Sequence, residues 1–143
     1  MVLASMGGEV SIESWNKAYS HFGKLTSDQL QLKYDDITWN KTVKILHDCF
    51  IRTGRYQGLI VVTFHNPSVR DFIANYIEKS AYTQRLLLEG AFYPEQLTSL
   101  YDEFLSQNMP EIFRSNNISL SDSNLEILRA KLIEFLSNNP ESC

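Results

Sequence analysis

The alternation of apolar and polar positions predicts helices toward both ends of the chain and a β-hairpin in the middle. Apolar residues recur with helical spacing over residues 12–22 and again over 39–46. Residues 49–53 and 59–65 are instead rich in β-branched and aromatic side chains, and glycines bound the five residues 54–58 between them. We therefore expect two strands joined by a five-residue loop with a bulge.

Local signals place the ends of the first helices. Ser11 is the expected N-cap of the first long helix, and Gly23 is expected to end it. Thr26 or Ser27 would then cap a short helical turn. A second helix begins near residues 36–38, and its apolar stripe is widened by Ile45.

The strongest helix-start signal follows the second strand. Asn66 and Pro67 end that strand, and Ser68 is expected to cap the next helix. Asp71 stands three residues after Ser68, as in a capping box, although Glu is the usual residue at that position. The order helix, strand, turn, strand, helix is the second half of a winged-helix unit.

Beyond residue 80 the chain is helical in character. Leu86, Leu87 and Leu88 share one helix, and Pro94 begins another that is expected to reach Leu105. Further features of this segment are an interruption at Pro110, a short turn at Ile112 and Phe113, and a last helix that is capped by Ser121 and stopped by Asn138, Asn139 and Pro140. The sequence thus predicts a mainly α fold with a small β-hairpin, in which a winged-helix domain over 1–80 precedes a helical, solenoid-like segment over 81–143.

The first residues leave two alternatives open. Residues 1–6 resemble the last turns of an apolar helix that Gly7 and Gly8 would end. A chain that opens inside such an element suggests a piece of a longer protein. A frayed native terminus would explain the same residues equally well.

Charge is distributed unevenly along the chain. Net charge is −4 overall, which argues against a nucleic-acid binder driven by total charge. Residues 38–70 carry five basic and one acidic side chain, or +4, whereas residues 1–37 carry −2 and residues 71–143 carry −6. The expected winged-helix unit therefore contains the basic part of the chain.

Cysteine usage and hydropathy indicate a reduced, cytoplasmic setting. Cys49 and Cys143 are the only cysteines and form no framework of disulfides. No apolar run approaches the length that a membrane span requires, so no membrane partner is expected.

Motifs for catalysis or metal binding are weak. The glycines at 54 and 58 lack the following lysine of a phosphate-binding loop, so we expect no nucleotide hydrolysis and no bound cofactor. His47, Cys49 and His65 cluster in sequence, but a structural zinc site normally needs four such ligands. Ser68 could pair with His65 as nucleophile and base, yet no third orienting group is evident. We expect neither a metal site nor an enzyme.

The basic block permits a different function. Lys41 and Lys44 would lie on the outer face of the helix over 39–46, with Arg52 and Arg55 toward the hairpin. A winged helix would place that helix in the major groove of DNA and the hairpin on the phosphate backbone. A small DNA-binding transcriptional regulator is therefore the alternative function.

The segment Phe64-His65-Asn66-Pro67-Ser68-Val69-Arg70-Asp71-Phe72, preceded by residues 46–51, resembles the C-terminal winged-helix region of the novel STAND class of P-loop NTPases. The likeness extends over about residues 1–100 and is specific around 64–72. In that family the winged helix packs on a nucleotide-binding domain and helps to hold an off or on state, a helical sensor region follows, and bacterial members are associated with defence against phage.

The resemblance implies a part of a switch rather than a complete enzyme, because the nucleotide-binding domain is not in this sequence. It implies a signalling role through protein interaction, with a nucleotide-binding domain of a parent protein or another protein as partner. The signature positions carried onto this chain are His65, Asn66, Pro67, Ser68, Arg70 and Asp71. Their implied role is structural or interdomain, and not catalytic.

Overall fold

The computed structural model describes residues 1–31, 34–47, 49–101 and 122–138, and it is mostly helical with one small antiparallel sheet. The expected fold class, mainly α with a small β-hairpin, is confirmed. The helices of the described part are α1 (Val2–Ser5), α2 (Ile12–Leu30), α3 (Asp36–Leu46), α4 (Pro67–Glu78), α5 (Ala81–Glu89), α6 (Pro94–Tyr101) and α8 (Asp122–Asn138). The strands are β1 (Glu9–Ser11), β2 (Ile51–Tyr56) and β3 (Leu59–Phe64).

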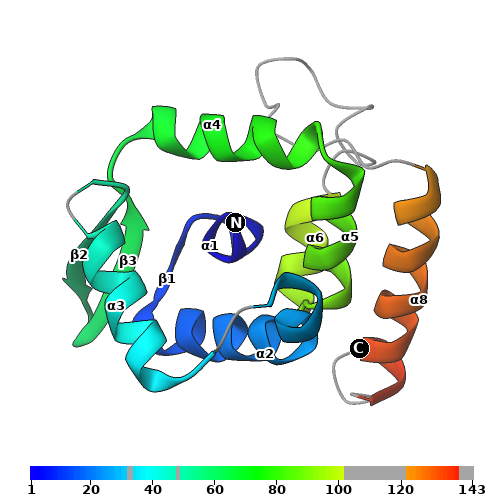
Figure 1. Cartoon of the computed structure of the whole chain (residues 1–143), viewed down its shortest axis with the longest axis horizontal. Helices are drawn as coiled ribbons and strands as arrows, with labels where there is room; N and C mark the ends of the chain where they lie inside the picture. Colours follow the sequence, from blue (N-terminus) through cyan, green and yellow to red (C-terminus); the bar gives the residue numbers. More distant parts are fainter. Residues whose placement is uncertain (32–33, 48, 102–121, 139–143) are drawn as a thin grey trace.

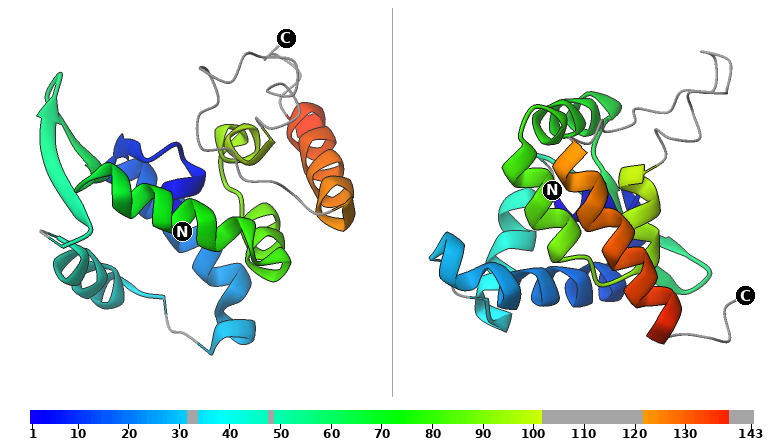
Figure 2. Two further views of the ribbon diagram at one scale, coloured as in Figure 1. Left: turned by 90° about the horizontal axis from the view of Figure 1, so that it is seen from above. Right: turned by 90° about the vertical axis from the view of Figure 1, so that its right-hand side faces the viewer.

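The short helix α1 lies in the middle of the molecule and the longer elements surround it (Figure 1). In that view α4 runs above α1 and α2 runs below it. Helix α3 and the β2–β3 hairpin form one end of the molecule, and α5, α6 and α8 form the opposite end, as the views in Figure 2 also show. Two ends of different construction therefore flank a shared centre.

The sheet has the strand order β1-β3-β2, with both pairings antiparallel. The hairpin pairs one residue with one along its whole length, from Ile51↔Phe64 to Tyr56↔Leu59. The turn is therefore the two residues Gln57 and Gly58, whose φ angles are 49° and 82°. The expected five-residue loop with a bulge is wrong, because a two-residue turn with both φ positive matches the twist of the strands and lets Gly54 pair with Val61.

One apolar cluster holds the elements together. The edge of the Trp15 ring meets the Trp39 ring with centroids 4.8 Å apart, which joins α2 to α3. Val62 at the centre of the sheet and Ile77 on α4 are fully buried in the same cluster. Its members come from both sides of residue 80, and the domain boundary proposed there stays a prediction.

Helix α2 is longer than expected, because Gly23 does not end it. A Cβ at Gly23 would collide with the ring of Tyr34, so the glycine serves close packing inside the helix. Thr26 is a helix-interior residue whose hydroxyl donates to the Phe22 carbonyl at 2.7 Å, and Ser27 likewise donates to the Lys24 carbonyl at 3.3 Å. Neither residue caps a separate turn, and that expectation is wrong.

The outer side of α3 also differs from the prediction. Trp39 is buried as expected, and Val43 and Leu46 are half-buried against the core. Ile45, however, is 71% exposed and does not widen the buried stripe. The period of the helix turns Ile45 away from the side on which Trp39, Val43 and Leu46 pack against the core.

The helices after residue 80 largely follow the expected pattern. Leu86, Leu87 and Leu88 are buried in α5, Pro94 begins α6, and α8 is described over Asp122–Asn138. The expectations for Leu105, Pro110, Ile112, Phe113, Ser121, Asn139 and Pro140 lie outside the described residues. Among the described helices, none is both long enough and apolar enough to cross a membrane.

Candidate functional site

The signature residues lie where β3 turns into α4. Phe64 is the last residue of β3, and Pro67 is the first residue of α4. Asn66 is the N-cap of α4, because its Oδ1 accepts a hydrogen bond from the Val69 amide at 3.0 Å. Pro67 suits the first helical position, where no backbone N–H is needed. The expected cap at Ser68 is therefore wrong, because Asn66 is the last extended residue and the helix already begins at Pro67.

A shallow open groove of about 320 Å³ lies beside this corner. Four of the six signature residues line it, namely His65, Asn66, Pro67 and Arg70. Ser68 and Asp71 are exposed on the first turns of α4 and are not among its lining residues. The remaining wall comes from Gly7, Gly8 and Glu9 before and in β1, and from Arg52, Thr63 and Phe64 in the hairpin.

The glycine pair before β1 shapes the floor of this groove. Gly7 and Gly8 have φ angles of 84° and 83°, which favour glycine strongly. A Cβ at Gly8 would also lie 3.2 Å from two carbons of the Phe64 ring and 3.9 Å from Cδ of Arg70. The glycines thus end α1, as the sequence predicted, and they also let β1 approach the signature corner. Only the first of these roles was visible in the sequence.

Charge in the groove is mainly positive. Glu9, Thr63 and Arg52 stand side by side across the three strands, since Thr63 pairs with both of the others. Arg52 donates from Nε to the Thr63 hydroxyl at 3.2 Å, which directs its guanidinium across the sheet. Arg70 approaches from α4. Two guanidinium groups and one carboxylate therefore line the groove, and an acidic group from outside would complement its excess of positive charge.

The residues considered for metal binding and catalysis do not form a centre in the described part of the chain. No group of three or more His, Cys, Asp or Glu side chains there could hold a metal ion. His47 ends α3 and lies within hydrogen-bonding distance of Thr53, with its Nε2 3.3 Å from Thr53 Oγ1. Cys49 is exposed, and the His65 amide donates to the carbonyl of the neighbouring Phe50 at 2.8 Å. The backbone of residue 65 therefore lies beside that of residue 50, as expected if the two strands pair.

The four cations of the DNA-binding alternative occupy two different surfaces. Lys41 and Lys44 are exposed on α3. Arg52 and Arg55 are three residues apart in β2, so their side chains leave opposite faces of the sheet. Arg52 belongs to the signature groove, whereas Arg55 stands near the tip of the hairpin. A single DNA-facing set of all four is therefore not assembled.

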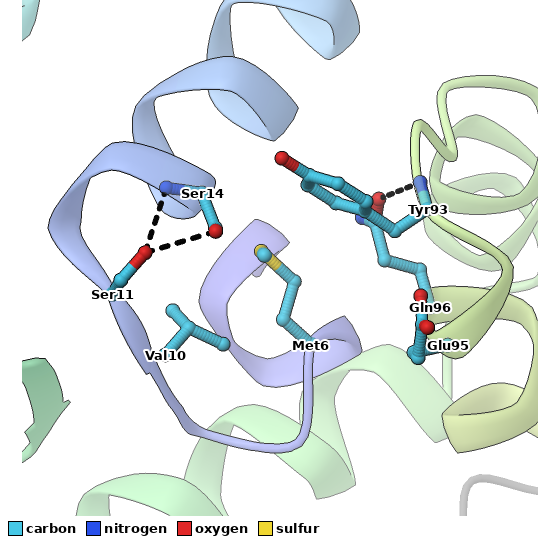
Figure 3. A pocket seen from close by; sticks show the side chains of 7 residues that line it. All are labelled: Met6, Val10, Ser11, Ser14, Tyr93, Glu95 and Gln96. Carbon is cyan, nitrogen blue, oxygen red and sulfur yellow. Dashed lines mark hydrogen bonds between the residues drawn. The ribbon is translucent and has the colours of Figure 1, made fainter.

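A second cavity, of about 420 Å³, was not indicated by the sequence and lies between β1, the start of α2 and the start of α6 (Figure 3). Three of its polar side chains, those of Ser11, Ser14 and Gln96, already form hydrogen bonds within the fold. Ser11 caps α2 by accepting from the Ser14 amide at 3.1 Å. Gln96 accepts from the amides of Phe92 and Tyr93 at 2.8 and 3.0 Å, and donates to the Ser5 hydroxyl at 3.0 Å. These bonds tie α6 to α1.

A third cavity, of about 400 Å³, opens beside α1 and is lined mainly by apolar and aromatic side chains. Tyr34 lines this cavity. Burial raises the pKa of its hydroxyl above the ordinary value, while a hydrogen bond with Thr26 opposes that rise. The polar lining groups are few, and the cavity forms part of the junction between α1, α2 and α3.

Comparison of the chain with family models, with curated proteins and with solved structures found no match. The resemblance to the STAND class therefore depends on the residues of the signature themselves. The groove that they line is the candidate site on which the functional proposal rests.

Proposed function

We propose that this chain is a non-catalytic regulatory and interaction segment of a STAND-type signalling NTPase, of the kind found in bacterial defence, and that the signature groove docks on its nucleotide-binding domain. The observation that carries the proposal is the convergence of His65, Asn66, Pro67 and Arg70 in one groove with Arg52. These signature residues come from one corner of the chain, and they face a solvent-open, largely cationic surface rather than the core.

The element order supports the winged-helix part of this proposal. Helix, strand, two helices and a two-stranded hairpin follow one another from α1 to β3, and the sheet order is β1-β3-β2. The strand β1 enters the sheet beside β3, so the hairpin keeps a free outer edge at β2. This is the arrangement expected of a winged helix, with α3 in the place of the recognition helix.

The test is binding to the nucleotide-binding domain that the proposal requires. We expect the coding sequence before Met1 to encode a P-loop domain, and that domain, produced separately, to bind this chain in isothermal titration calorimetry. Arg70→Glu should weaken binding at least tenfold, because a carboxylate would then face the acidic partner group. Lys79→Glu reverses charge at the other end of α4 and serves as the matched control. Absence of a P-loop domain, or equal effects of the two variants, would contradict the proposal.

The second candidate is a small winged-helix DNA-binding regulator. It is favoured by the exposure of Lys41 and Lys44 on α3, which lies at the same end of the molecule as the β2–β3 hairpin (Figure 1). It requires salt-dependent duplex binding that is weakened by Lys41→Ala, Lys44→Ala and Arg55→Ala, as fluorescence anisotropy would measure. Sequence-specific binding at physiological salt would favour this candidate over the first, and no duplex binding at low salt would exclude it.

A further inference from the structure

The third cavity, of about 400 Å³ beside α1, is walled largely by aromatic rings. Six aromatic side chains line it, namely Trp15, Tyr19, Phe22, Tyr34, Phe50 and Phe64. We call this space the aromatic cavity. Its walls come from α1, α2, α3, α4 and the base of the hairpin, so several elements surround it rather than one flat helix face. It shares only Phe64 with the lining of the signature groove and is therefore a separate site.

The aromatic cavity extends from the core to the surface. Among its lining residues, Trp15 is 3% exposed and Ile51 is 2% exposed, so these walls belong to the core itself. Phe50, which also lines it, is 47% exposed. A ligand that enters from the exposed side would therefore leave water and contact side chains of the core.

The polar groups of the aromatic cavity are few and uncharged. None of the described residues that line it has a charged side chain. Met1 exposes its side chain, but burial lowers the pKa of its amino group to about 6, so this amine is mostly uncharged at neutral pH. The Tyr19 hydroxyl and Thr42 Oγ1 are 3.5 Å apart, which is long for a hydrogen bond between hydroxyls. Each of these two oxygens can therefore take a further partner.

The chemistry of these walls points to a small-molecule ligand. We propose that the aromatic cavity binds a neutral ring compound carrying one polar oxygen, a hydroxyl or a carbonyl, within reach of Tyr19 and Thr42. Aromatic walls favour a ring, because rings pack well in offset-stacked and edge-to-face arrangements. The volume lies at the lower end of the range for small-molecule sites, about 300–1,000 Å³, which suits one or two fused rings. This site does not depend on the function proposed for the signature groove.

Other occupants fit the aromatic cavity less well. A carboxylate or phosphate would lose its water with no cationic side chain to replace it. A quaternary ammonium group could meet the faces of the rings, but no carboxylate among the lining residues would balance its charge. A helix of a partner protein is about 10–12 Å across with its side chains, which is too wide for a space of this volume.

The experiment compares three probes that share one ring system, using the whole chain at neutral pH. They are 2-naphthol, which is neutral, the anion 2-naphthoate, and the cation 2-naphthyltrimethylammonium. We expect 2-naphthol to bind with a Kd below about 1 mM in isothermal titration calorimetry. It should bind at least tenfold more tightly than either charged probe. Its amide shifts in NMR should gather near Tyr19, Thr42 and Ile51. Absence of naphthol binding, equal binding of a charged probe, or shifts confined to other regions would overturn the proposal.

A substitution that fills the aromatic cavity identifies the site. Thr42→Phe places a ring in the space that the ligand would occupy and should weaken naphthol binding at least tenfold. Thr98→Phe makes the same change at an exposed position of α6 and should leave binding unchanged. Circular dichroism checks the fold of both variants. Equal effects of the two substitutions would overturn the proposal.

A second substitution tests the polar oxygen without filling the space. Thr42→Val removes the hydroxyl and nearly keeps the shape, so naphthol should bind about threefold to tenfold more weakly. Naphthalene, which has no hydroxyl, should bind this variant and the original chain equally. If both compounds responded alike, Thr42 would not contact the ligand's oxygen and the proposal would fail. Arg70→Glu should leave naphthol binding unchanged, which separates this site from the signature groove.

Discussion

The two ends of this molecule differ in their buried polar side chains, although both expose apolar ones, such as Ile133 on α8 and Ile45 on α3. At one end, α5, α6 and α8 bury polar groups, since Gln84, Gln96 and Asn124 are each no more than 2% exposed. Asn124 donates from Nδ2 to the Ala81 carbonyl at 2.9 Å and to Oε1 of Gln84 at 3.0 Å. At the other end, α3 and the hairpin expose Ile37, Ile45 and Leu59. Buried polar side chains fix one arrangement of helices, whereas exposed apolar side chains leave a surface available for a partner.

The largest expected effect is the contrast in stability between a leucine at each end. Leu97→Ala removes a fully buried side chain of α6 and should lower the free energy of unfolding by about 3 kcal/mol. Leu59→Ala removes a leucine that is 54% exposed at the hairpin turn, and its cost should stay within about 0.5 kcal/mol. Urea unfolding followed by circular dichroism measures both. If the two substitutions lowered the free energy of unfolding by similar amounts, the two leucines would not differ in their contribution to stability.

A smaller effect is expected from the buried amide that joins α6 to α1. Gln96→Ala leaves the amides of Phe92 and Tyr93 and the Ser5 hydroxyl without this partner. We expect a loss of about 2 kcal/mol, because buried donors that lose their acceptor keep their desolvation cost. Gln29→Ala, at an exposed position of α2, is the control in the same urea series. If the two variants were equally stable, the buried hydrogen bonds of Gln96 would not contribute to stability.

The cap of α4 provides a finer test at the signature corner. Asn66→Ala should cost about 1 kcal/mol, because the Val69 amide loses its acceptor. Ser68→Ala should change stability by less than about 0.5 kcal/mol, since Ser68 is exposed and does not cap the helix. Thermal unfolding of the two variants separates these roles. The reverse order of effects would restore Ser68 as the cap.

The smallest expected effect is a pH dependence at His21, where α2 meets the far end of the molecule. Burial and the positive charges of Lys131 and Lys24 lower the pKa of His21 below its ordinary value of 6.5, and its ring lies 5.2 Å from that of Phe92. The unfolded chain therefore binds more protons just below pH 6.5, so stability should rise as pH increases toward and through that value.

His21→Gln should flatten this part of the pH–stability curve, and Lys131→Gln should flatten it in part, since burial is the first cause of the shift. Urea unfolding at a series of pH values from 5 to 8, around the ordinary histidine pKa of about 6.5, measures the slope. If the slope of stability against pH were unchanged in His21→Gln, the pH dependence would come from other titrating groups.

Several features of the fold were accessible from the sequence because they depend on neighbouring residues. Ser11 caps α2, the glycine pair ends α1, and Pro94 begins α6, as local backbone preferences indicated. The hairpin was also predicted, but its turn was not, because pairing across Gly54 depends on the partner strand. Ser68 and Asn66 both suit a cap, and only the course of the chain out of β3 selected Asn66.

What the sequence by itself determined is the order of the longer helices and the hairpin, and the basic character of residues 38–70, because period and charge are local properties of the chain. Strand β1 was not predicted, because its three residues form a strand by pairing with the distant β3. The tertiary structure decided the roles that depend on distant residues. Gly23 packs under Tyr34 rather than ending a helix, and Arg52 meets Arg70 in one groove although eighteen positions separate them. The tertiary structure also left Ile45 exposed to solvent. The apolar pattern of a helix shows which residues share a face, but it does not show how much of that face the neighbouring elements cover.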